Sequence, residues 1–89
     1  MLTQQILEKH FPIPITNEYT DFQQFRQDLV DSIVYLLQYD VERLAQAMYQ
    51  IDVGEEVFRT ALYAQDAVRL ADLAIERVSQ KRQVYPQKI

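Results

Sequence analysis

The stretch TDFQQFRQDLVDSIVYLLQ, residues 20–38, decides the fold class of this chain. Its large apolar side chains recur at intervals of three or four positions, which is the spacing of one face of an α-helix. Thr20 and Gln23 have the spacing of a capping box, in which each side chain bonds to the other residue's backbone amide. The stretch therefore predicts a helix over residues 21–38. Its buried face is expected to hold Phe22, Phe25, Leu29, Ile33 and Leu36, widened by Val30, Val34 and Leu37.

Shorter amphipathic segments lie on both sides of this helix. Asp40 and Asp66 each precede an apolar stripe, and aspartate is a favoured N-cap residue, so we expect helices at 41–50 and 67–83. We expect two more helices at 55–63 and 3–10, the last capped by Thr3 and ended by the prolines that follow it. The inward-facing residues are expected to be Ile6, Leu7, Phe11, Val41, Leu44, Ala45, Met48, Ile51, Val57, Phe58, Ala61, Leu62, Ala67, Leu70, Ala71, Leu73, Ala74, Ile75 and Val78.

Glycine and proline are scarce between these segments, which favours helix over strand. The chain has one glycine among 89 residues, its three prolines lie near the two ends, and it contains no Asn-Gly or Asp-Gly hairpin signal. We therefore predict an all-α fold, a compact single-domain bundle of four to five short helices over residues 1–89. How firmly residues 1–19 dock is left open, and residues 84–89 are treated as a tail.

The stretch YQIDVGEEVF, residues 49–58, combines the glycine with three carboxylates and is the best candidate for a chemical site. A calcium loop fails on spacing, because the twelfth position counted from Asp52 is Tyr63. Adjacent Glu55 and Glu56 point about 100° apart on a helix, so they do not form a facing acid pair. The stretch therefore predicts a joint in which Asp52 or Gly54 starts a helix, with a Glu55–Arg59 surface pair.

Other sequence features argue against catalysis and secretion. The chain has no cysteine and a single histidine, His10, and it lacks a glycine-rich phosphate loop and a nucleophile elbow. An enzymatic role would have to use His10 with Glu8 or Glu18. We therefore predict that the chain is not an enzyme and has no catalytic, cofactor-binding or metal-ligating residues. The missing cysteine, signal sequence and long apolar run predict a cytoplasmic protein.

The charge distribution is uneven along the chain. The formal charge is −4, residues 1–42 contain seven acidic and two basic residues, and residues 77–89 contain four basic residues and no acidic one. A helix-turn-helix interface is disfavoured because Glu55 and Glu56 would face phosphates. The basic patch Arg77, Lys81 and Arg82 supports the alternative hypothesis of a nucleic-acid-associated regulator.

Aromatic residues give the leading functional hypothesis. Six of the ten aromatic residues are tyrosines, and tyrosine is enriched at protein interfaces. Tyr35, Tyr39 and Tyr49 are the candidate interaction patch. We therefore expect a small helical protein–protein interaction or accessory domain, self-associating or binding a larger partner, whose acidic first half steers a basic partner.

Overall fold

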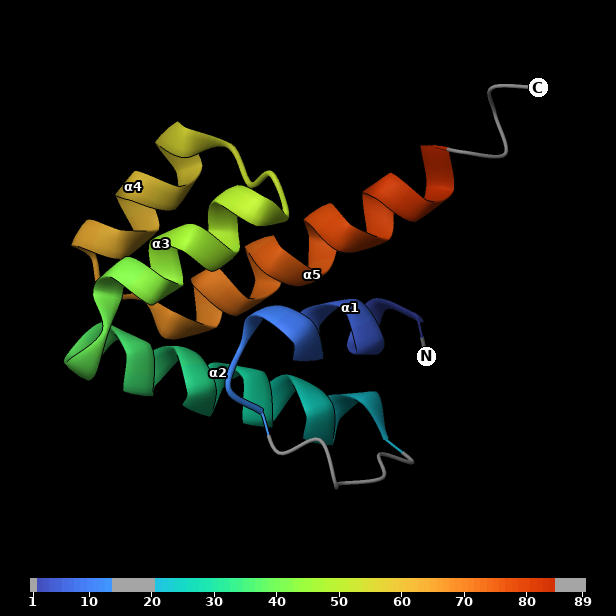
Figure 1. The fold of residues 1–89 in the computed structure, drawn as a ribbon, viewed down its shortest axis with the longest axis horizontal. Helices are drawn as coiled ribbons and strands as arrows, with labels where there is room; N and C mark the ends of the chain where they lie inside the picture. The colour runs from blue at the N-terminus through green and yellow to red at the C-terminus, as the bar shows by residue number, and fades with distance from the viewer. Residues whose placement is uncertain (1, 14–20, 85–89) are drawn as a thin grey trace.

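The computed structural model describes residues 2–13 and 21–84, and the side chains of residues 3–13 and 21–80. This part of the chain forms five helices and no strand (Figure 1). The helices are α1 (Leu2–His10), α2 (Phe22–Tyr39), α3 (Val41–Gln50), α4 (Glu55–Tyr63) and α5 (Ala67–Val84). The predicted all-α class is confirmed, and each predicted helix boundary lies within one residue of the observed one.

Helix α5 holds the bundle together. It packs against α1, α2 and α4, while α2 also packs against α3 (Figure 1). α2 and α5 run in roughly opposite directions, and the last turns of α5 project past the other helices. The two ends of the molecule therefore differ: one carries the turn between α2 and α3, and the other carries the end of α5.

The core forms where the apolar faces of these helices meet. The predicted stripe of α2 is confirmed at Phe25, Leu29, Ile33 and Leu36, which are fully buried, while Phe22 is half-buried. Ala71 and Ala74 of α5 are fully buried in this core, where a methyl group fills little of the space between helices. The largest fully buried side chains are Phe25, Leu7, Leu29, Ile33, Leu36, Leu44, Met48, Leu70 and Val78.

Aspartates cap the starts of α2, α3 and α5. Asp40 accepts a hydrogen bond from the amide of Arg43 and Asp66 accepts one from the amide of Arg69, at 3.2 and 3.0 Å. Both predicted caps are thus confirmed. Asp40 also closes α2, because its own amide donates to the carbonyl of Leu36.

Two predicted caps are wrong. α2 is capped by Asp21, which accepts from the amide of Gln23 at 2.9 Å, so the cap lies one residue after Thr20. A carboxylate is the stronger acceptor for first-turn amides. Thr20 lies outside the described residues. Thr3 is a buried residue within α1, which already begins at Leu2, so it does not cap that helix.

The stretch at 49–58 is a helix joint, as predicted, and its glycine is not the residue with the unusual backbone. Asp52 adopts the left-handed conformation at φ 64°, whereas Gly54 has φ −55° and is the N-cap of α4. The amide of Val53 donates to the carbonyl of Met48, and that of Asp52 donates to Tyr49, both at 3.0 Å. This is the Schellman motif, which satisfies the last carbonyls of α3.

The end of α4 has the same Schellman motif, again with a non-glycine residue in the left-handed conformation. Gln65 is left-handed at φ 53°, and its amide donates to the carbonyl of Leu62 at 3.0 Å. The amide of Asp66 donates to the carbonyl of Ala61 at 3.1 Å. Asp66 therefore closes the motif at the end of α4 with its amide and caps α5 with its carboxylate. This double role explains why the turn between α4 and α5 is so short.

Three valines that were expected to face the core are exposed. Val34, Val41 and Val57 expose 41%, 44% and 46% of their surface. The apolar stripes predicted from periodicity were wider than the surface that neighbouring helices cover. Val41 and Val57 also lie in the first turns of α3 and α4, where packing against the bundle has only begun.

Candidate interaction surface

Tyr35 and Tyr39 form an exposed aromatic pair on α2. They lie one helical turn apart, and their ring centroids are 5.1 Å apart with the planes tilted by 43°. Aromatic rings attract each other in such offset and tilted arrangements. The side chains still expose 52% and 72% of their surface. The structure thus brings together two of the three predicted patch tyrosines and leaves most of both rings in contact with solvent.

Tyr49 lies apart from this pair. It is 62% exposed in the last turn of α3, at the opposite end of that helix from Tyr39. A helix of ten residues is about 15 Å long, so the three tyrosines do not form one compact cluster. We therefore centre the candidate surface on Tyr35 and Tyr39.

Two of the unexpectedly exposed valines extend this aromatic pair along the chain. Val34 directly precedes Tyr35 in the sequence of α2, and Val41 begins α3 just after the turn at Asp40. We call Val34, Tyr35, Tyr39 and Val41 the α2–α3 corner. Sequence reasoning missed the valines because an apolar residue at the edge of a helical stripe gives no signal of whether a neighbouring helix covers it.

The charge around the α2–α3 corner is mostly negative. Residues 31–43 contain Asp31, Asp40 and Glu42 but a single basic residue, Arg43, and all four are exposed. Asp31 accepts a hydrogen bond from the side-chain amide of Gln27 at 3.0 Å, which fixes its direction without neutralising its charge. Carboxylates therefore flank the tyrosine pair on both sides in the sequence, although that of Asp40 also caps α3.

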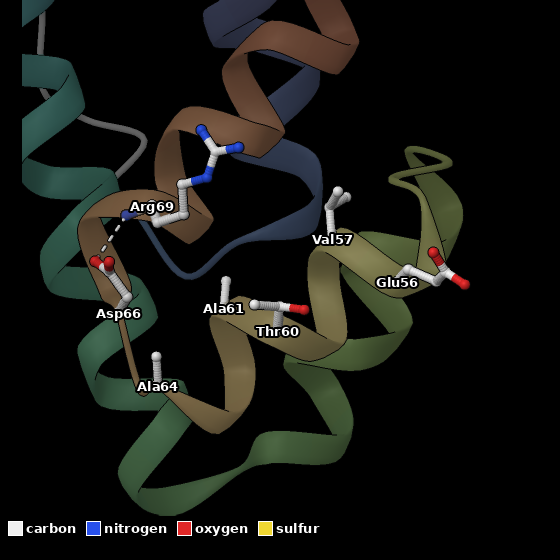
Figure 2. Close-up of a pocket in the computed structure, with 7 residues that line it drawn as sticks. All are labelled: Glu56, Val57, Thr60, Ala61, Ala64, Asp66 and Arg69. Carbon is white, nitrogen blue, oxygen red and sulfur yellow. Dashed lines mark hydrogen bonds between the residues drawn. The ribbon is translucent and has the colours of Figure 1, made fainter.

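A shallow groove of about 470 Å³ lies between α4 and the start of α5 (Figure 2). Short side chains from α4 line it, including the Thr60 hydroxyl, and Glu56, Asp66 and Arg69 supply its charged groups. The Asp66 carboxylate is already used as the cap of α5, as the dashed line in Figure 2 shows. The groove is lined by Glu56, Val57, Thr60, Ala61, Ala64, Asp66 and Arg69.

A second groove, of about 410 Å³, lies where the α3–α4 joint meets α5. Its charged groups include Asp52 and Arg77, whose carboxylate and guanidinium are 2.9 Å apart. This ion pair ties the left-handed residue of the joint to α5. Both named charges are therefore engaged with each other.

The ion pair between Arg26 and Asp72 lies in neither groove and joins α2 to α5. The guanidinium donates two hydrogen bonds to the carboxylate, at 2.9 and 3.0 Å. These bonds lower the pKa of Asp72 and raise the pKa of Arg26. Both side chains are bonded to each other, which fits a role in holding the two helices.

The basic patch is described only in part. Arg77 is half-buried, its pairing with Asp52 uses one guanidinium nitrogen, and its buried Nε has no hydrogen-bond partner among the described residues. The side chains of Lys81 and Arg82 lie outside the described residues. The nucleic-acid hypothesis for this patch stays a prediction, with one of its three residues already engaged.

The one grouping considered for an enzymatic role, His10 with Glu8 or Glu18, is described only in part. Glu8 accepts a hydrogen bond from Gln4 at 2.9 Å, His10 is half-buried at the end of α1, and Glu18 lies outside the described residues. Within residues 2–13 and 21–84, no three histidine, aspartate or glutamate side chains converge where they could hold a metal ion.

The geometry defines a small all-α bundle whose most distinctive described surface is an acidic corner bearing two exposed tyrosines. None of its described helices has the length and apolar character needed to cross a membrane. No protein-family model, curated protein or solved structure matches the chain. Inferences about function therefore rest on the surface itself.

Proposed function

We propose that this protein is an interaction or accessory domain that binds another protein through the α2–α3 corner. The observation that carries the proposal is the Tyr35–Tyr39 pair, whose rings lie 5.1 Å apart between centroids yet remain mostly exposed. Tyrosine suits this role because its ring gives a large contact area while only two side-chain torsions are fixed on binding. The flanking valines are also exposed, and the turn between α2 and α3 lies at one end of the molecule (Figure 1).

The acidic residues around the corner favour a positively charged partner. Asp31, Asp40 and Glu42 favour a partner segment that carries lysine or arginine beside its apolar side chains. A guanidinium can also lie over a tyrosine ring, which attracts cations through its π-electron face. The proposed mechanism is therefore electrostatic steering followed by burial of the two rings. The cysteine-free composition supports a cytoplasmic location for this encounter.

The strength of such binding can be bounded. Covering the exposed parts of the two tyrosines and two valines removes on the order of 300 Å² of apolar surface, a gross gain of roughly 7 kcal/mol. Association itself costs about 4–15 kcal/mol, so the apolar contacts leave little surplus. The acidic residues must therefore contribute, and we expect affinities in the micromolar range or weaker that fall as salt rises.

The experiment is a fluorescence-anisotropy titration of a labelled synthetic peptide that alternates arginine and leucine. The double variant Tyr35→Ala with Tyr39→Ala should weaken binding by about tenfold or more. Tyr63→Ala is the matched control, because Tyr63 is 80% exposed on α4 and lies outside the corner. A peptide with glutamate in place of arginine should not bind. If removing Tyr63 costs as much affinity as removing the corner pair, the corner is not the binding surface.

A further inference from the structure

We propose that the partner of the α2–α3 corner is a second copy of this chain, which docks its basic residues 81–89 there. This inference rests on the proposed function of the corner. The segment reads KRQVYPQKI and combines Lys81, Arg82 and Lys88 with apolar side chains and no acid. It is thus complementary in charge and in apolar character to a corner that presents Asp31, Glu42 and two tyrosine rings.

A chain cannot place this segment on its own corner. Arg26 and Asp72 mark where α2 and α5 meet, and the two helices leave that point in opposite directions (Figure 1). Tyr35 lies nine residues along α2, about 14 Å away, and Val84 lies twelve residues along α5, about 18 Å the other way. Fully extended, residues 85–89 span at most about 18 Å, which is too short for the return.

The contact is therefore intermolecular and joins two different surfaces. Such a head-to-tail interface leaves one corner and one basic segment free in every dimer, so further copies can add until a ring closes or the assembly continues. A dimer in which two corners face each other would instead stop at two copies, and it would bring the acids of both chains together. Charge complementarity favours the head-to-tail arrangement.

The test is sedimentation velocity of the full chain from low micromolar to millimolar concentration, at low salt and at about 0.5 M salt. At low salt the average sedimentation coefficient should rise steadily with concentration, and at high salt this rise should be lost. The variant Lys81→Glu with Arg82→Glu and the variant Tyr35→Ala with Tyr39→Ala should each remain monomeric. Circular dichroism verifies that both keep their helices.

Mixing the two variants gives the decisive result. Each retains one intact surface, so the mixture should form a one-to-one dimer and nothing larger. A wild-type chain that stays monomeric at millimolar concentration, or a basic-segment variant that associates as well as wild type, overturns the inference. The arginine–leucine peptide distinguishes failure of this inference from failure of the proposed function. If the peptide binds the corner while self-association is absent, the proposed function stands and the second-copy partner is wrong. If neither occurs, both are wrong.

Discussion

Replacing Gln65 with glycine should stabilise this protein, because Gln65 adopts a left-handed backbone at the end of α4. Its φ is 53°, and its amide closes the Schellman motif on Leu62. A residue with a Cβ atom pays about 1–2 kcal/mol for this conformation, whereas glycine adopts it freely. Glycine also raises the entropy of the unfolded chain, which reduces the gain in folding free energy by about 0.4–1 kcal/mol. The net expectation is a gain of about 0.5–1 kcal/mol.

Thermal and urea unfolding followed by circular dichroism measure this gain. A gain of that size corresponds to a rise in Tm of about 2–8 °C for a domain this small. Gln65→Ala should give no such rise, because alanine keeps the Cβ atom that makes the conformation costly. Gln46→Gly, at an exposed position within α3, should lose about 1 kcal/mol. A loss of stability in Gln65→Gly would refute the assignment of this residue to the left-handed end of α4.

Further variants test the ion pair, the core and the joint. The pKa of Asp72 is lowered by Arg26, so the stability that this pair contributes is present above the ordinary aspartate pKa of about 4 and is lost as pH falls below it. Asp72→Asn should therefore flatten the acid limb of a stability–pH profile; an unchanged limb would assign acid sensitivity to other groups. Phe25→Ala should cost about 3–5 kcal/mol in chemical unfolding, since the ring is fully buried, and a cost under about 1 kcal/mol would contradict its place in the core. Gly54→Ser should add a few tenths of a kcal/mol, because a hydroxyl can cap α4 and the added Cβ would lie 3.5 Å from Val57, an ordinary contact; a marked loss would show that the position needs glycine.

The helices were predictable because their signals are local. Asp40 and Asp66 mark helix starts through bonds to amides only three residues away, and the stripe of α2 repeats over five turns. The covered width of each stripe was not predictable, since it depends on how helices distant in sequence are placed. Val34 and Val57 were assigned to the core for that reason, although both are exposed.

The joint between α3 and α4 shows a second limit. A lone glycine after a helix suggests the left-handed position, yet Asp52 occupies it and Gly54 caps the next helix. Aspartate tolerates this conformation better than most residues, and here its carboxylate is also held by Arg77. Arg77 lies 25 positions away along the chain, so the sequence around Asp52 does not predict this contact.

The candidate surface was predictable only where its residues share one helix. Tyr35 and Tyr39 are four positions apart, so a helix must place them on one side, and their rings are in fact in contact. Tyr49 belongs to another helix, and its distance from the pair depends on the length and direction of α3. The contribution of Val34 and Val41 to the surface depends on tertiary packing in the same way.

The most direct test of the central claim is an amide chemical-shift map of the isotopically labelled protein during titration with the arginine–leucine peptide. The α2–α3 corner should respond first and most strongly, with the largest changes between residues 31 and 43. Tyr63 and its neighbours should change little. Shifts concentrated along the groove between α4 and α5, or no localised shifts at saturating peptide, would contradict the assignment of binding to the tyrosine pair.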